Sequence, residues 1–97
     1  MSEIIKHFNI RVFGKVQGVF FRASARVHAE ALSVKGFAQN ENDGSVYIEA
    51  EGSEESLKMF IEWCYRGSEH AEVTKVEAKE SGIKNFTEFK VNRGMIF

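Results

Sequence analysis

Two parts of the sequence carry residues suited to binding and hydrolysing a phosphorylated molecule. The first, 14–22, reads Gly-Lys-Val-Gln-Gly-Val-Phe-Phe-Arg and lies between an alternating apolar run and a helical pattern. Its two glycines allow the backbone to turn tightly and to point several N–H groups the same way. The helix that follows adds unpaired N–H groups, and Arg22 lies in its first turn. This stretch predicts a site for a doubly charged phosphoryl group.

The second part ends at Asn40, which together with Arg22 could act on a bound phosphoryl group. Arg22 stays protonated and cannot act as a base, but its guanidinium can hold two phosphate oxygens while charge shifts. The carboxamide of Asn40 is no base either, but it can hydrogen-bond a water molecule and orient it. Both residues also have structural interpretations, since Arg22 could be a surface arginine and Asn40 could bond its own turn.

An anion-binding loop, an arginine and an asparagine suit a reaction whose leaving group needs no proton donor. A carboxylate is such a group, because its conjugate acid has a pKa of about 4. Water would attack phosphorus in line, and the protein would mainly position the reactants and neutralise charge. We expect the three histidines to be non-catalytic, with His28 in the core, His7 beside a strand edge and His70 in a polar loop. No pair of them has metal-ligand spacing, so no metal site is expected.

The elements that position these residues follow from the apolar periodicity of the chain. Alternating apolar residues predict strands, and apolar residues three or four apart predict helices. The expected strands are 8–12, 36–40, 46–50, 73–80 and 87–91, and the expected helices are 21–32 and 54–66. Ser53 is a good N-cap for the second helix, whose apolar stripe leaves Trp63 on its flank, and Asn42-Asp43-Gly44 is a hairpin-turn signal.

This order of elements is the split βαβ pattern of a ferredoxin-like fold. The expected class is α+β: an α/β sandwich of order βαββαβ with an additional edge strand, in which two helices cover one face of an antiparallel sheet. The strands before and after the first helix would be parallel, so both end at one edge of the sheet, where ligands commonly bind. Asn40 is therefore predicted to lie beside the glycine loop and Arg22.

Length and composition limit the class of protein. A chain of 97 residues, 43% of them hydrophobic, can form one domain with one core, which we expect to span 1–97. The formal net charge of -1 argues against a surface that binds nucleic acid or an anionic membrane. The single cysteine, Cys64, is expected to be an inert core residue. With no signal-like or membrane-spanning run, a cytoplasmic monomer is the simplest expectation.

The sequence also resembles the acylphosphatase family. Residues 14–22 are similar to the first signature of that family, and residues 36–40, followed by Gly44, Val46 and Gly52, are similar to the second. The two motifs occur in the family's order, and the resemblance covers essentially the whole chain.

The resemblance implies an enzyme, an acylphosphatase, that hydrolyses the carboxyl-phosphate bond of acyl phosphates to carboxylate and inorganic phosphate without a metal or cofactor. By motif position, Arg22 would bind the phosphoryl group and Asn40 would orient the attacking water. Backbone N–H groups would form the phosphate cradle, from Lys15, Val16, Gln17, Gly18, Val19 and Phe20. The family is described as substrate-assisted, with a phosphate oxygen accepting the proton of the water.

Several positions depart from the family's usual pattern. Ser33 stands where a glycine often follows the first helix, which is expected to strain or reshape that cap. Ser68 stands where a Gly-Pro step often follows the second helix. Glu41 replaces a small polar or apolar residue after Asn40 and is expected to perturb the handling of water or product. The tail is atypical, and its apolar end, 95–97, is expected to pack back on the body.

Two non-catalytic alternatives stay open. Residues 35–38 resemble part of the RNA-recognition motif signature, which would indicate an RNA-binding module of the same fold. That stretch falls in the second expected strand instead of the third, and Gln39 replaces an apolar or aromatic residue. The other alternative is a related domain that binds phosphate or carbamoyl phosphate within a larger system. Turnover of an acyl phosphate would distinguish the enzyme from both, but the sequence does not indicate the physiological acyl group.

Overall fold

The computed structural model describes residues 4–92, and the helices and strands in this range occur in the predicted order. They are β1 (Ile5–Lys15), α1 (Phe21–Ala31), β2 (Lys35–Asn40), β3 (Val46–Ser53), α2 (Glu54–Arg66), β4 (Glu72–Ser81) and β5 (Phe89–Asn92). β1 extends beyond the predicted 8–12 at both ends, so Gly14 and Lys15 belong to the strand and not to the loop. The apolar tail at 95–97 lies outside the described residues.

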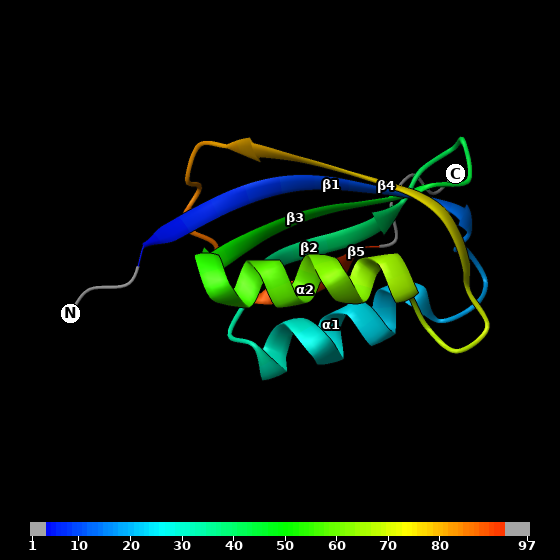
Figure 1. Ribbon diagram of the computed structural model, residues 1–97, viewed down its shortest axis with the longest axis horizontal. Coiled ribbons are helices and arrows are strands. Elements are labelled where there is room, and N and C mark those ends of the chain that lie inside the picture. Colours follow the sequence, from blue (N-terminus) through cyan, green and yellow to red (C-terminus); the bar gives the residue numbers. More distant parts are fainter. Residues whose placement is uncertain (1–3, 93–97) are drawn as a thin grey trace.

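The five strands form one sheet in the order β4-β1-β3-β2-β5 (Figure 1). β3 lies between β1 and β2 and is antiparallel to both, so β1 and β2 run in the same direction, as predicted. β4 is antiparallel to β1. β5 is the expected additional edge strand, but it pairs in parallel with β2, so the sheet is mixed and not wholly antiparallel. This parallel pair arises because the chain crosses from one edge of the sheet to the other before it enters β5.

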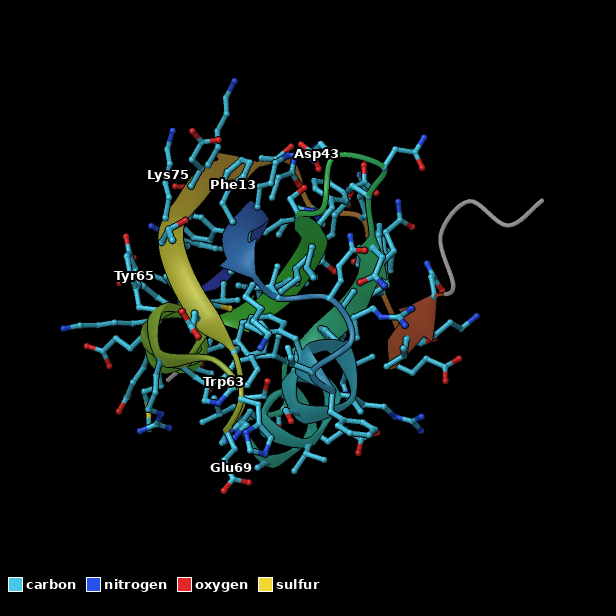
Figure 2. All side chains as sticks on the ribbon, turned by 90° about the vertical axis from the view of Figure 1, so that its right-hand side faces the viewer. Phe13, Asp43, Trp63, Tyr65, Glu69 and Lys75 are labelled. Atoms are coloured by element: carbon cyan, nitrogen blue, oxygen red, sulfur yellow. The ribbon has the colours of Figure 1, made fainter. Side chains whose placement is uncertain are left out.

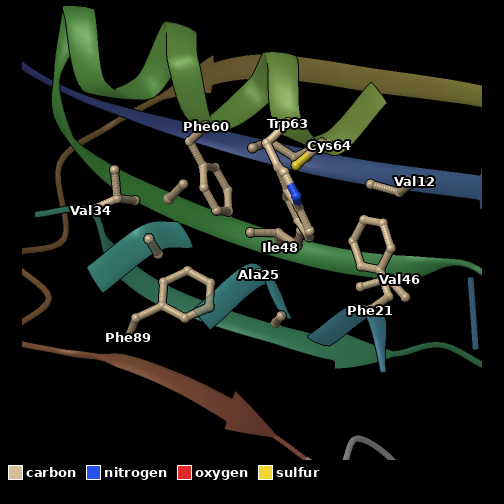
Figure 3. Close-up of a cluster of buried hydrophobic side chains, with 14 of the residues drawn as sticks. Val12, Phe21, Ala25, Val34, Val46, Ile48, Phe60, Trp63, Cys64 and Phe89 are labelled. Atoms are coloured by element: carbon tan, nitrogen blue, oxygen red, sulfur yellow. The ribbon is translucent and has the colours of Figure 1, made fainter. Parts of the chain in front are cut away.

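Both helices cover the same face of the sheet, as the ferredoxin-like fold predicts (Figure 1). α1 lies over β2 and β5, and α2 lies over β1, β3 and β4. The side chains that fill the layer between helices and sheet include Val12, Phe21, Ala25, Val46, Ile48, Phe60, Trp63, Cys64 and Phe89 (Figure 3).

Two residues of α2 illustrate how this core is packed. Trp63, expected on the flank, is buried and packs on Phe21 with their ring centroids 5.0 Å apart. Its long aromatic side chain reaches the core from the side of the helix. Cys64 is fully buried as predicted, and burial raises the pKa of its thiol, so the sulfur is poorly reactive.

The helix ends differ in how well their residues suit the backbone. The N-cap prediction for α2 is confirmed, because Ser53 Oγ accepts a hydrogen bond from the Ser56 N–H at 3.1 Å. After α1, Ser33 has a φ of 59°, in the left-handed region that favours glycine. The Val34 N–H donates to the Ala29 carbonyl at 2.8 Å, which closes the helix in the Schellman manner. The expected strain at Ser33 is therefore present.

The connection between β4 and β5 crosses the sheet face that the helices leave open. We call residues 82–88 the crossing segment, because β4 and β5 are the two edges of the sheet. The backbone N–H groups of Lys84 and Phe86 donate to the Glu51 carboxylate of β3, at 2.5 and 2.9 Å. The Phe86 ring packs on His7 of β1 and edge-on against Phe37 of β2. These contacts hold the segment across the sheet.

His7, which was expected beside a strand edge, is fully buried beneath the crossing segment. Its Nδ1 lies 2.7 Å from Glu51 Oε2, and its Nε2 lies 3.0 Å from Glu49 Oε1. Lys84 Nζ also donates to Glu49 Oε1, at 2.9 Å. His7, Glu49 and Glu51 are buried, whereas the side chain of Lys84 is half exposed. The alternation of apolar residues in β1 correctly places His7 on the polar face of the strand. That face is covered by the crossing segment, which is distant in sequence.

Candidate active site

The loop that joins β1 to α1 lies at the end of the sheet where β1 and β2 finish, which faces the viewer in Figure 2. Val16 and Val19 bury their side chains in the core, whereas Gly18 is exposed and has a φ of 75° that favours glycine. Gly14 has another role, because it lies at an irregularity in the pairing of β1 with β4. A Cβ atom there would lie 2.1 Å from the Glu72 carbonyl oxygen, so only glycine permits this approach.

Two side-chain contacts hold the loop in place. Gln17 Nε2 donates to the carbonyl oxygens of Glu41, at 2.8 Å, and Ser45, at 2.9 Å, and so ties the loop to the turn between β2 and β3. Ser68 Oγ donates to the Val19 carbonyl at 2.7 Å and ties the loop to the turn after α2. The loop conformation is therefore fixed by segments far away in the sequence, before any ligand binds.

The N-terminus of α1 has no side-chain cap. Phe20 is its N-cap residue, with a φ of 60° and no side-chain atom that can accept a hydrogen bond, and the first turn has no acidic residue. The Ser24 N–H donates to the Phe20 carbonyl at 3.0 Å, so the N–H groups of 21–23 precede the first helical hydrogen bond. A helix terminus of this kind carries partial positive charge and favours an anion.

A cavity of about 340 Å³ lies where the loop, the N-terminus of α1 and the end of β2 meet. Its lining residues are Val16, Gly18, Phe20, Phe21, Arg22, Ala23, Asn40 and Val91. Arg22 and Asn40 thus share one cavity, as the parallel course of β1 and β2 predicts. Three residues of the predicted cradle do not line this cavity. Lys15 lies at the end of β1, Gln17 bonds the turn between β2 and β3, and Val19 is buried in the core.

The two polar side chains of the cavity differ in their partners. Arg22 Nη1 donates to the Asn92 carbonyl at the end of β5, at 2.6 Å. Asn40 Oδ1 is buried and has no hydrogen-bond partner among the described residues. Buried acceptors without partners are uncommon in folded proteins because they are costly, so the described protein contacts do not account for the position of this atom.

Sequence reasoning missed the contribution of β5 to this site. Val91 lines the cavity, and the carbonyl of Asn92 holds Arg22. The alternation of Phe89 and Val91 predicts a strand, but it does not indicate that this strand pairs with β2.

Other residues that the sequence singled out lie outside the cavity. The Glu41 carboxylate accepts from Gln39 Nε2 at 2.9 Å and lies 3.6 Å from Arg11 Nη1, so no contact supports the expected effect on water or product. His28 is half-buried and stacks on Trp63, with ring centroids 4.7 Å apart, in a groove between the helices. It is therefore a wall residue of that groove and not the packed core residue that was expected.

Three further features of the described residues concern RNA, metal ions and membranes. Phe37, in the stretch that resembles an RNA-binding signature, is half-buried, and its ring packs edge-on against Phe86 of the crossing segment with the centroids 5.9 Å apart. Within 4–92, no group of three or more His, Cys, Asp or Glu side chains is arranged to hold a metal ion. Neither described helix has the length and apolar character to traverse a bilayer.

Comparisons with known proteins agree on one family. The family model described as Acylphosphatase matches residues 8–91. An acylphosphatase of Marinobacter nauticus is 42% identical over 87 residues, which are 89% of this chain and 95% of that protein. The structure of an acylphosphatase from Coxiella burnetii is similar with a TM-score of 0.88 and 35% identity, over 91% of this chain and 93% of that chain. An acylphosphatase from Bacillus subtilis also gives a TM-score of 0.88, with 33% identity, over 92% of this chain and 99% of that chain.

Proposed function

The chain belongs to the acylphosphatase family of enzymes, and on this premise we propose that it hydrolyses acyl phosphates in the cavity that Arg22 and Asn40 share. The observation that carries the proposal is the meeting of three features at one place. These are an uncapped helix N-terminus, a guanidinium, and a buried amide oxygen that has no partner within residues 4–92. An anion and a polar neutral molecule would together satisfy all three.

The phosphoryl group would bind at the loop and the N-terminus of α1. Backbone N–H groups from the loop and the first turn donate to its oxygens, and the helix dipole favours its negative charge. Arg22 uses Nη1 to bond the Asn92 carbonyl, which leaves its other N–H groups to hold two phosphate oxygens. The Asn92 carbonyl therefore fixes the orientation of the guanidinium that binds the substrate.

Asn40 would orient the attacking water. Its Oδ1 accepts a hydrogen bond from the water, whose oxygen attacks phosphorus in line with the acyl oxygen. The new bond joins phosphorus to the water oxygen, and the bond between phosphorus and the acyl oxygen breaks with its electron pair on the carboxylate. A phosphate oxygen takes the proton of the water, so the products are a carboxylate and inorganic phosphate. No metal is needed because the carboxylate leaves without protonation.

We expect Asn40→Ala and Arg22→Ala to separate catalysis from binding. In excess EDTA, the wild-type protein should hydrolyse benzoyl phosphate. Asn40→Ala should lose about 100-fold or more in kcat, with little change in inhibition by inorganic phosphate, because only the water loses its partner. Arg22→Ala should lose both turnover and phosphate inhibition. Steady-state kinetics with phosphate as a competitive inhibitor measure both quantities.

Gln39→Ala is the matched control, because Gln39 is the neighbouring amide and bonds Glu41 outside the cavity. Its turnover should stay close to that of the wild type. Equal losses of phosphate inhibition in Asn40→Ala and Arg22→Ala would contradict the role given to Asn40. Loss of wild-type turnover in EDTA would contradict the metal-independent mechanism.

A further inference from the structure

Phe20 is poorly suited to the position that it occupies. It is the N-cap residue of α1, where residues with short polar side chains are preferred because they accept hydrogen bonds from the first turn. Its φ of 60° lies in the left-handed region, which is unfavourable for a bulky residue. Its side chain is 79% exposed, so it gains little from burial. Backbone strain and exposed aromatic surface that coincide at a cavity indicate a functional constraint.

The cavity that Phe20 lines is mainly apolar beyond its two polar residues. Arg22 and Asn40 are assigned to the phosphoryl group and the water, so the acyl group must meet the remaining wall. In the described part of the chain, that wall is formed by Phe20, Ala23 and Val91 with Val16 and Phe21. Arg22 is the one charged residue among those that line the cavity in residues 4–92. A second negative charge on the substrate would therefore find no cation there.

Given the proposed function, we infer that the Phe20 ring binds the acyl group and that the enzyme prefers acyl phosphates whose acyl group is uncharged and apolar, aromatic ones in particular. The ring lines the cavity at the helix terminus to which we assign the phosphoryl group. An aromatic acyl group can pack against it in an offset or edge-on arrangement, whereas an acetyl group offers little contact area. Phe20 thus adds a specificity role for its side chain to the role of its backbone N–H.

The test compares kcat/KM for benzoyl phosphate and acetyl phosphate in the wild type and in Phe20→Asn. Asparagine tolerates the left-handed conformation and can cap α1, so this variant should fold at least as well as the wild type. The benzoyl-to-acetyl ratio of kcat/KM should fall about tenfold, because an apolar contact is lost for one substrate only. Intrinsic reactivity differences between the two substrates cancel in this comparison of ratios.

Phe20→Tyr should restore the wild-type ratio, because it keeps the ring, and Val27→Asn should leave the ratio unchanged, because Val27 is exposed on α1 outside the cavity. Succinyl phosphate should be a poorer substrate than butyryl phosphate, since its second carboxylate lacks a partner. An unchanged ratio in Phe20→Asn, or a preference for succinyl phosphate, would overturn the inference while leaving the proposed function intact. A wild type that hydrolyses none of the four substrates would overturn both.

Discussion

Ser33 shows how a single residue can be mismatched to the backbone that carries it. Its left-handed φ is imposed by the way the chain closes α1 and enters β2, through the hydrogen bond from Val34 to Ala29. A serine pays for this conformation with steric strain between its Cβ and its backbone, whereas glycine has no Cβ. The mismatch concerns stability alone, because Ser33 does not line the cavity.

We therefore predict that Ser33→Gly raises the free energy of unfolding by about 0.5–1 kcal/mol, since it removes strain at a compatible site. Urea denaturation followed by tryptophan fluorescence measures the change. Ser56→Gly is the control, because the backbone of Ser56 is helical in α2. This substitution should lower the free energy of unfolding by about 0.5 kcal/mol. If Ser33→Gly were destabilising, the left-handed conformation would not be the source of strain.

At the same scale, the sequence predicted that Asn40 lies beside Arg22, and the structure places both residues in the lining of one cavity. This placement could be predicted because it follows from local signals, a glycine loop before a helix and the end of a parallel strand, whereas the roles of the two residues stay predictions. The roles of Gln17 and Asn92 could not be predicted. Gln17 acts through a side-chain contact to a turn in another part of the chain, and Asn92 acts through its carbonyl, which no residue type reveals.

At the scale of elements, the crossing segment depends on the carboxylate of Glu51. Burial alone would raise the pKa of Glu51, but hydrogen bonds from the Lys84 N–H, from His7 and from the Phe86 N–H outweigh it and hold the pKa below its ordinary value. Burial would also raise the pKa of Glu49. Hydrogen bonds from Lys84 and Tyr47 outweigh this effect, so the pKa of Glu49 lies below its ordinary value. Tyr47 has its own pKa raised to about 12, by burial and by its bond to Glu49. Both carboxylates are therefore stabilised as anions by the folded state.

We predict that Glu51→Gln lowers the free energy of unfolding by about 1–3 kcal/mol at pH 7, because two backbone N–H groups and His7 lose a charged acceptor. The native pKa of Glu51 is depressed, so its contribution is complete above the ordinary value of 4.5 and is lost as the pH falls through the lower native value. The difference in free energy of unfolding between the wild type and Glu51→Gln should therefore become smaller below about pH 4.5. Denaturation at several pH values measures it.

Hydrogen exchange gives a local reading of the same contact. In Glu51→Gln, the N–H groups of Lys84 and Phe86 should lose protection, because each donates to the Glu51 carboxylate. Glu69→Gln is the control, since the Glu69 side chain is 89% exposed and should affect neither quantity. If the difference in free energy of unfolding between wild type and Glu51→Gln stayed constant down to pH 3, the charge of Glu51 would not be what holds the crossing segment.

The sequence predicted each helix and strand from periodicity, but it did not predict which strand β5 pairs with. β5 was expected as an edge strand, and its parallel pairing with β2 was not foreseen. Periodicity reports which side of a strand faces the core and contains no information on its neighbour. For the same reason Glu49 and Glu51 could not be recognised as buried: they alternate as exposed residues do, and only the crossing segment covers them.

At the scale of the whole molecule, the chain has no proline, although its sheet pairs strands that are distant in sequence. Pairing of distant strands slows folding, but it does not produce the phase of tens of seconds that comes from proline isomerisation. The single tryptophan, Trp63, is 5% exposed and reports on core formation.

Refolding from denaturant should therefore follow one phase, with no slow component that a prolyl isomerase accelerates. Stopped-flow fluorescence of Trp63 measures it, and varying the time spent unfolded is the control, since it should not change the amplitudes. A slow phase that grows with the time spent unfolded would contradict the prediction. The expectations of a monomer and of one domain over 1–97 stay predictions.

The hydrogen bond between Arg22 and the Asn92 carbonyl cannot form until the end of the described chain has been synthesised. The two residues are separated by 70 positions, and β5 supplies the carbonyl. Synthesis makes the loop and α1 early, but the guanidinium has no fixed orientation until β5 has left the exit tunnel and added to β2. A chain that ends before β5 contains the loop between β1 and α1 and both polar side chains of the cavity, but it lacks the carbonyl that bonds Arg22. Given the role proposed for Arg22, we expect activity only once β5 has paired with β2.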